Sequence, residues 1–226
     1  MLRVGHRGAA ALAPANTIQA VEAALEQGVD FVELDVFGRP DKTLVLGHSR
    51  RELGDEPVTL EDVFAFLAET APDVGLLADL KGAGWEEELV EALRRHDLVE
   101  RAVACTSNVV ALEALRRLEP RLARSRTYPR GRLYFAERRF SIPVGGPVLR
   151  AMRIALPYRI AGLVEEVEAS AVTLKHHVVS RAVVERCHEL GVAVFVWTVN
   201  DRAVCRRLDA LGVDGVITDD PRILQE

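Results

Sequence analysis

The sequence predicts a (β/α)8 TIM barrel, and three observations predict it. Short strand-like runs alternate with amphipathic helical stretches along the 226 residues. Eight such runs follow one another, which is the number that one barrel needs. Polar residues stand at or just past the carboxyl ends of many runs: His6, Glu33, Asp35, Asp79, Lys81, Thr106, Ser107, Arg126, Trp197, Asn200 and Asp219. A barrel gathers all strand ends around one mouth, whereas the alternative, an open doubly wound sheet, gathers only those beside its switch point.

The first half of the chain supplies four of the expected strands. These are residues 2–6, 31–36, 74–81 and 102–106. Helices are expected over 16–27, from 60 onward, over 86–95 and over 109–118, because apolar residues recur there three or four apart. Gly28 is a stop signal for the first helix, and Thr59 is an N-cap for the second. Residues 43–47 are expected to return antiparallel to 31–36, which makes a small hairpin across the turn at 39–42.

The second half supplies the other four strands and an insert. The expected strands are residues 122–126, 169–174, 192–199 and 214–218. Helices are expected over 180–190 and 202–211, which end at Gly191 and Gly212. The insert follows the strand at 122–126 and occupies residues 128–160, far more than an ordinary connection needs. The chain is expected to form a single domain over residues 1–226.

Composition excludes several other classes of protein. Hydrophobic residues make up 49% and charged residues 28% of the chain, which describes a globular protein rather than a disordered or coiled-coil one. No apolar run reaches the length of a membrane-spanning helix, and the first residues lack the apolar core of a signal peptide. Three cysteines without paired spacing predict a reducing, cytoplasmic location. The net charge of -5 does not indicate a nucleic-acid partner.

Two pairs of charged residues predict a metal site inside the barrel. Glu33 and Asp35 are two residues apart on one strand, so both side chains point to the same face. Asp79 and Lys81 repeat this spacing on the next strand. Three convergent carboxylates repel one another unless a cation lies between them, and an oxygen-only site suits Mg²⁺ or Ca²⁺. The alternative is an ion pair between the carboxylates and an inward arginine.

Two histidines bracket this acidic site. His6 begins the run His6-Arg7-Gly8 at the end of the first strand, where glycine allows a sharp turn and Arg7 can bind a phosphate with two nitrogens. His48 ends the hairpin return beside the second strand. A lone histidine is more often a structural hydrogen-bonding group, but two beside an acidic metal site favour acid–base chemistry.

These residues, taken in order, resemble the glycerophosphodiester phosphodiesterases. The resemblance is carried by His6-Arg7-Gly8, Pro14-Ala15-Asn16-Thr17, Glu33-Leu34-Asp35, His48, Asp79-Leu80-Lys81, Trp197-Thr198-Val199-Asn200 and Gly215-Val216-Ile217-Thr218-Asp219. It implies a metal-dependent barrel hydrolase that converts glycerophosphodiesters to glycerol 3-phosphate and an alcohol. It further implies metal ligands at Glu33, Asp35 and Asp79, a catalytic pair at His6 and His48, phosphate contacts at Arg7 and Lys81, and Trp197 lining the glycerol pocket.

The chain departs from the pattern of this family at three positions. Ala15 and Ser49 stand where the family usually has carboxylates, and Asp79 replaces a usual Glu. Two alternatives to the main activity therefore remain open. One is a lysophospholipase D-like or sphingomyelinase D-like phosphodiesterase, and the other is a protein that binds phosphate ligands with impaired catalysis.

The segment 128–160 is predicted to cap the barrel mouth. It leaves from the carboxyl end of a strand, where insertions in barrels reshape the active site. It mixes arginines with apolar residues, and prolines such as Pro157 divide it into short pieces. Residues 148–156 could form a basic amphipathic helix that contacts a membrane surface transiently. The alternative is the ordinary fifth helix of the barrel with a solvated basic face.

Overall fold

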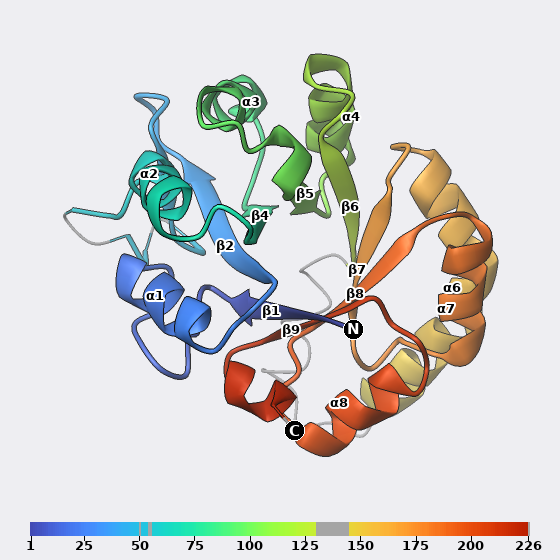
Figure 1. The fold of residues 1–226 in the computed structure, drawn as a ribbon. Helices are drawn as coiled ribbons and strands as arrows, with labels where there is room; N and C mark the ends of the chain where they lie inside the picture. The colour runs from blue at the N-terminus through green and yellow to red at the C-terminus, as the bar shows by residue number, and fades with distance from the viewer. Residues whose placement is uncertain (50, 54–55, 130–144, 226) are drawn as a thin grey trace.

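The computed structural model describes residues 1–49, 51–53, 56–129 and 145–225, and it has the predicted barrel (Figure 1). The strands are β1 (Leu2–His6), β2 (Phe31–Gly38), β3 (Leu44–Leu46), β4 (Gly75–Leu80), β5 (Ala102–Thr106), β6 (Ala123–Tyr128), β7 (Ala171–Lys175), β8 (Ala193–Trp197) and β9 (Gly215–Thr218). They form one sheet in the order β1-β9-β8-β7-β6-β5-β4-β2-β3. Because β1 also pairs with β2, eight parallel strands close into a ring.

Helices surround this ring on its outer side (Figure 1). They are α1 (Ile18–Glu26), α2 (Leu60–Thr70), α3 (Glu86–Arg95), α4 (Val109–Leu118), α6 (Gly145–Glu165), α7 (Arg181–Glu189) and α8 (Arg202–Asp209), with 3-10 turns η1 (Val99–Arg101) and η2 (Pro221–Leu224). The predicted N-cap at Thr59 is confirmed, since its hydroxyl accepts from the Asp62 N–H and Asp62 bonds back to the Thr59 N–H. Helix α1 begins at Ile18 with Thr17 as its N-cap, two residues later than the expected start at residue 16.

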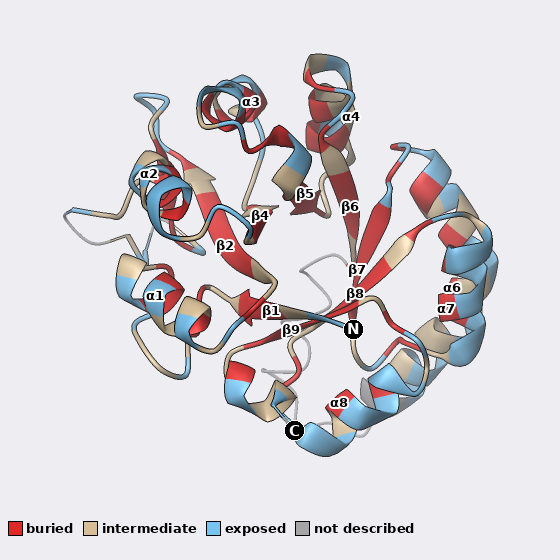
Figure 2. Ribbon diagram, viewed as in Figure 1, coloured by how far each residue is buried: buried red, intermediate tan, exposed pale blue. Residues whose placement is uncertain are grey.

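The apolar core has two layers, one between strands and helices and one inside the barrel. The strands are largely buried, and the helices turn their exposed faces outward (Figure 2). The layer inside the barrel contains Val4, Leu77, Val103, Cys105, Ala171, Phe195 and Ile217. Side chains on one face of a strand recur every two residues. The next inward positions on four of these strands are therefore polar or amphipathic, at His6, Asp79, Trp197 and Asp219.

The expected hairpin is present on β2. β3 pairs antiparallel with β2 and places Leu46 opposite Val36. The Gly47 N–H then donates to the Asp35 carbonyl oxygen at 2.9 Å. This hydrogen bond fixes the start of the loop that carries His48, so the hairpin brings that side chain to the end of β2.

Residues 145–160 of the segment that was expected to cap the barrel mouth belong to a barrel helix. Residues 145–160 lie in α6, which continues to Glu165 and passes through Pro157 without ending. Leu156, Ile160 and Val164 recur four apart and are buried in the same apolar cluster as residues of α7. This burial explains why the proline does not divide the segment there. The alternative of an ordinary barrel helix thus describes residues 145–160, whereas residues 130–144 lie outside the described chain.

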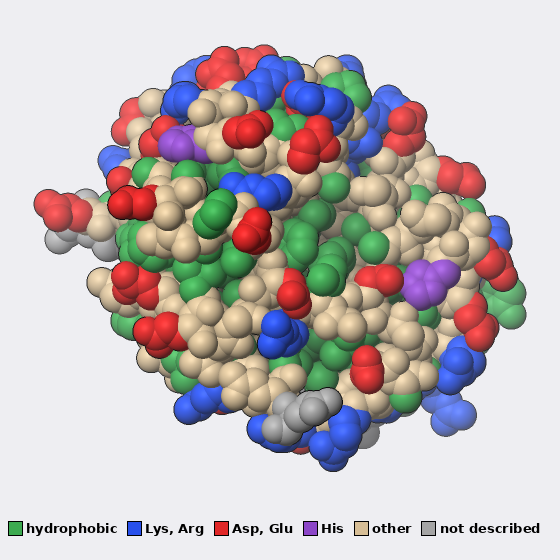
Figure 3. All heavy atoms as spheres, viewed as in Figure 1, with side chains coloured by type: hydrophobic (Ala, Val, Ile, Leu, Met, Phe, Trp, Pro, Cys, Tyr) green, Lys and Arg blue, Asp and Glu red, His purple; other side chains and the backbone are tan. Residues whose placement is uncertain are grey.

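The surface seen in Figure 3 mixes both signs of charge. Arg and Lys side chains alternate there with Asp and Glu side chains over the outer helices and loops. In the part of the chain that the structure describes, no helix is both long and apolar enough to cross a bilayer.

Candidate active site

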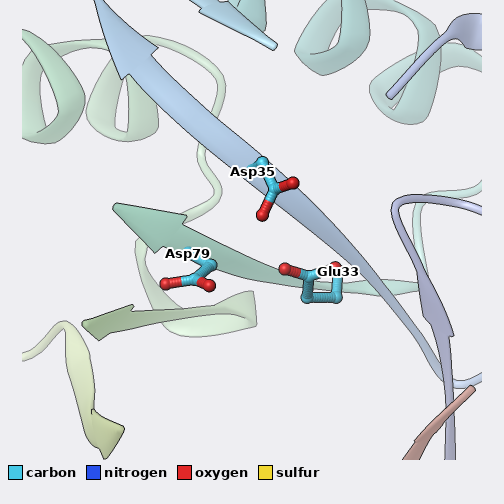
Figure 4. A group of neighbouring side chains, drawn as sticks. All are labelled: Glu33, Asp35 and Asp79. Atoms are coloured by element: carbon cyan, nitrogen blue, oxygen red, sulfur yellow. The ribbon is translucent and has the colours of Figure 1, made fainter. Parts of the chain in front are cut away.

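Three carboxylates from β2 and β4 lie close together inside the barrel (Figure 4). Glu33 and Asp35 share the inner face of β2, and Asp79 lies beside Asp35 in the register with β4. One oxygen of each carboxylate lies within 4.8 Å of the others, and Glu33 and Asp35 are buried. The structure therefore brings together the three acids that the sequence predicted to converge.

Two cations lie within the same cluster. Nζ of Lys81 is 2.6 Å from Oδ1 of Asp35 and also contacts the carboxylate of Asp79. Nε of Arg7 is 2.9 Å from Oδ2 of Asp35. The ion pair with an inward arginine is thus present together with the acidic cluster. With both histidines neutral, three carboxylates face two cations, which leaves one negative charge in excess.

The pKa values of two acids reflect this balance. Burial raises the pKa of Glu33 to about 7; the charge of His6 opposes this shift, and the charge of Asp35 adds to it. Burial also works against ionised Asp35, but the hydrogen bond with His48 and the charges of Lys81 and Arg7 outweigh it. These partners hold the pKa of Asp35 well below its usual range. Asp35 is therefore ionised at neutral pH, whereas Glu33 is the acid that lacks sufficient positive charge.

The cluster fits a hard divalent cation. All three side chains offer carboxylate oxygens, which are the ligands that Mg²⁺ and Ca²⁺ prefer. Oδ1 of Asp35 is buried and accepts no hydrogen bond of good geometry, although the ammonium of Lys81 lies beside it. A divalent cation would turn the single excess negative charge into a single positive one. That net charge suits the binding of a phosphodiester anion.

His6 is held between two carboxylates. Its Nδ1 lies 2.5 Å from Oδ1 of Asp219, and its Nε2 lies 3.8 Å from Oε2 of Glu33. The amide of Asn200 donates to the other carboxylate oxygen of Asp219. Burial alone would lower the pKa of His6, but the charge of Glu33 and the bond to Asp219 outweigh it and raise the pKa. Asp219 therefore orients the imidazole and stabilises its protonated form.

His48 meets the cluster from the hairpin side. Its Nδ1 lies 3.3 Å from Oδ2 of Asp35, and Nη2 of Arg7 lies 3.3 Å from the same nitrogen. The His48 side chain is 42% exposed, in contrast to the buried carboxylate beside it. In both histidines Nδ1 faces a carboxylate, and in His6 the second ring nitrogen, Nε2, also lies 3.8 Å from Oε2 of Glu33.

The loop after β1 contacts the carboxylate cluster and has a left-handed backbone at two residues. Arg7 has φ 54° and Gly8 has φ 83°, both in the left-handed region. The Arg7 N–H donates to Oε2 of Glu33 at 2.9 Å, and a Cβ at position 8 would lie 2.4 Å from the backbone of Ala20. This conformation costs free energy at Arg7 but not at Gly8, and the close approach of Ala20 leaves no room for a side chain at position 8.

Asn16 is a site residue to which the sequence assigned no role. Its amide donates to Oδ2 of Asp35 at 3.2 Å, and its Oδ1 accepts from the Asp35 N–H at 3.0 Å. It is buried and has φ 60°, a conformation that Asn adopts more readily than most residues. The sequence feature that could have pointed to Asn16 is the four-residue motif at 14–17. For Asp219 and Asn200 it is their position just past the ends of strands.

Trp197 lies on a different side of the mouth. It ends β8, where it pairs in register with Lys175 of β7, and its Nε1 donates to the Thr173 carbonyl oxygen at 3.3 Å. Two strands, β9 and β1, separate β8 from β2 around the ring. The structure therefore groups seven of the eight predicted site residues in one cluster that is built on Glu33, Asp35 and Asp79, and it places Trp197 apart from them.

The fold and site define a (β/α)8 barrel with an oxygen-rich, two-histidine centre at its mouth. The model of the glycerophosphoryl diester phosphodiesterase family matches residues 6–65 and 58–223, so the chain belongs to this family.

The relatives of the chain are similar along their whole lengths. A glycerophosphodiester phosphodiesterase of Caldanaerobacter subterraneus is 27% identical over 263 residues, which covers 99% of this chain and 96% of that one. An Oleispira antarctica phosphodiesterase, solved in complex with the product sn-glycerol-3-phosphate, matches with a TM-score of 0.79 at 22% identity, covering 100% of this chain and 95% of that one. The Thermotoga maritima glycerophosphodiester phosphodiesterase matches with a TM-score of 0.72 at 20% identity, covering 99% and 96%. The two structural matches support the fold.

The bond between His6 and Asp219 makes a prediction about pH dependence. The charge of Glu33 and the bond and charge of Asp219 all raise the His6 pKa, and Asp219→Asn removes the contribution of Asp219, so this pKa should fall. One limb of the kcat/KM profile should move to lower pH, the alkaline limb if His6 acts protonated and the acidic limb if it acts neutral. The maximum of kcat/KM should fall about 10- to 100-fold, as for partners that orient active-site groups. Two unmoved limbs would show that Asp219 does not act through His6.

Proposed function

We propose that this protein hydrolyses glycerophosphodiesters to glycerol 3-phosphate and an alcohol. The observation that carries the proposal is the pair of histidines, each with Nδ1 beside a carboxylate, next to a cluster of three carboxylates and two cations. Membership of the family supports the reaction class. The product named for the Oleispira antarctica relative supports the identity of the product here.

The phosphate of the substrate binds at Arg7 and Lys81 in this proposal. Both already lie against Asp35, so their positions are set before a substrate arrives. Their charges offset the negative charge on the phosphoryl oxygens as the bond breaks. Glu33, Asp35 and Asp79 would hold a Mg²⁺ or Ca²⁺ ion, which when bound supplies Lewis-acid polarisation of a phosphoryl oxygen.

His6 and His48 carry the two proton transfers. One Nε2 takes the proton from the attacking hydroxyl, and the other donates a proton to the leaving alkoxide. The resemblance to the family favours the neighbouring glycerol hydroxyl as the attacking group, with a cyclic phosphate that water then opens. Asp219 and Asp35 keep the two rings oriented during these steps.

The three departures from the family pattern leave this machinery in place. The carboxylate of Asp79 lies in the acidic cluster despite its shorter side chain. Ala15 and Ser49 lack carboxylates, but Asn16 and Arg7 already occupy Oδ2 of Asp35. These contacts favour an active hydrolase over a protein that only binds phosphate ligands.

The same features support the organisation and location of the protein. The described ranges form one closed barrel, which supports a single domain over residues 1–226. Cys105, Cys187 and Cys205 are all free and buried, which supports a reducing, cytoplasmic compartment.

The first test of this function is metal dependence. Release of glycerol 3-phosphate from glycerophosphocholine should require added Mg²⁺ or Ca²⁺ and should stop in a chelator. Asp35→Asn should reduce kcat by at least about 100-fold even in excess metal, because it removes the anion that Arg7 and Lys81 also contact. Asp41→Asn, an exposed change in the hairpin turn, is the control. Full turnover in the chelator would contradict the metal assignment.

The second test concerns the histidine pair. His6→Ala and His48→Ala should each lower kcat by about 10²- to 10⁴-fold, the usual contribution of general acid–base catalysis. The double variant should lose less than the product of the two effects if both serve one step. His188→Ala, on the exposed side of α7, should retain wild-type kcat. If His48→Ala also kept wild-type kcat, the pair would have no shared role.

An exposed apolar face on α6 favours a second candidate, turnover of lysophospholipids at a membrane surface. Val148, Ile154 and Tyr158 are 43%, 62% and 88% exposed on this helix. Arg150 and Arg159 are also exposed, and residues 145–164 contain no acid. Apolar residues flanked by arginines are typical of helices that bind anionic lipid surfaces.

Vesicle sedimentation tests this contact. The protein should sediment with phosphatidylglycerol-rich vesicles but not with phosphatidylcholine vesicles, and high salt should release it. The double variant Ile154→Ser, Tyr158→Ser should bind the phosphatidylglycerol-rich vesicles with an affinity at least about tenfold lower, because two apolar side chains no longer enter the lipid. It should also lose activity on a lysophospholipid selectively over glycerophosphocholine. Val110→Ser, which alters a side chain 65% exposed on α4, is the control. Equal sedimentation of both variants would exclude α6 as the contact.

A further inference from the structure

A lysine outside the carboxylate cluster stands on the inner face of β7. Ala171 of this strand belongs to the apolar layer inside the barrel. Thr173 follows it two residues later on the same face, and its hydroxyl hydrogen-bonds to the Ser125 hydroxyl of β6 at 2.6 Å. Lys175 continues this face by another two residues, at the carboxyl end of the strand. Only 6% of Lys175 is exposed. Its side chain therefore belongs to the inner wall of the barrel mouth.

β7 lies directly across the ring from β2. Going round in the order β1, β2, β4, β5, β6, β7, β8, β9, four steps separate β2 from β7 in either direction. The phosphate-binding groups of the proposed function occupy the β1, β2 and β4 side, and Trp197 occupies β8. The sector of β5 to β7 is thus the side of the mouth left for the alcohol half of a glycerophosphodiester.

Two features mark this sector as a polar subsite. The hydroxyl of Thr127, which follows Ser125 on the inner face of β6, is buried and has no hydrogen-bond partner. The chain also contains 26 Arg but only 3 Lys, and two of these three, Lys81 and Lys175, lie on inner faces of the barrel. Two of the three lysine ammonium groups of the chain therefore lie inside the barrel, where each acts as a compact point charge.

We propose that Lys175 and Thr127 form a subsite for an anionic group on the alcohol half of the substrate. The proposal rests on the phosphodiesterase function proposed above and names its substrate class. A buried ammonium attracts a phosphate or carboxylate and repels a quaternary ammonium. The protein therefore prefers diesters whose alcohol carries a second acidic group over those whose alcohol is cationic.

The test compares three diesters of different charge. Bis(glycerophospho)glycerol carries a second phosphodiester, glycerophosphoglycerol carries a neutral alcohol and glycerophosphocholine carries a cation. Lys175→Met should lower the ratio of kcat/KM for the first to that for the last by about 10- to 100-fold, mainly through KM, because it removes a charge-assisted contact. Lys175→Glu should lower the ratio further. Lys42→Met, at an ammonium 73% exposed in the hairpin turn, should leave the ratio unchanged.

Two outcomes would overturn the subsite. Equal loss on all three diesters would mean that Lys175 acts on the shared phosphate or on the fold, and an unchanged ratio would mean that it contacts no substrate anion. If the Lys175 variants do not fold, Thr127→Val should lower the same ratio by a smaller factor. If the wild type hydrolyses none of the diesters, the phosphodiesterase proposal fails. Calorimetry with the same three compounds then still decides whether Lys175 selects the anionic one.

Discussion

The rest of the site depends on the contacts that the buried carboxylate of Asp35 makes. It is fully buried, and four elements bring a partner to it: Arg7 from the loop after β1, Asn16 from the loop before α1, His48 from the hairpin and Lys81 from the end of β4. A buried carboxylate needs such partners because desolvation alone disfavours its charge. The same contacts hold the pKa of Asp35 low and fix the positions of Arg7, His48 and Lys81.

The neighbouring acid shows why this arrangement suits catalysis. Glu33 also lies on the inner face of β2, where burial raises its pKa to about 7. Its contacts with the Arg7 N–H and, at 3.8 Å, with His6 do not cancel this effect. One more cationic side chain beside Glu33 would neutralise its carboxylate. The cluster would then have no excess negative charge to attract a metal ion. The left-handed backbone at Arg7 and Asn16 points the same way, since such conformations cluster at functional sites.

The periodicity of the sequence predicted the fold and the acids, and long-range contacts explain what it missed. Alternation every two residues placed Glu33 with Asp35 and Asp79 with Lys81, and parallel register then aligned the pairs. The bond of His6 to Asp219 joins residues 213 positions apart, so no local pattern could show it. The ion pairs of Lys81 and Arg7 depend on side-chain reach rather than on spacing. The extent of α6 was missed because the buried side of the helix outweighs the effect of Pro157.

The closed ring also separates the constant part of the chemistry from the part that can vary. Every group proposed to act on the phosphate comes from β1, β2, β4, β9 or the hairpin, and they are tied to one another through Asp35, Glu33 and Asp219. A change to one of these residues disturbs its bonded neighbours. Thr127 and Lys175 stand on the inner faces of β6 and β7, on the opposite side of the ring from β2. In a barrel of this kind the head-group preference can therefore change while the phosphate chemistry is retained.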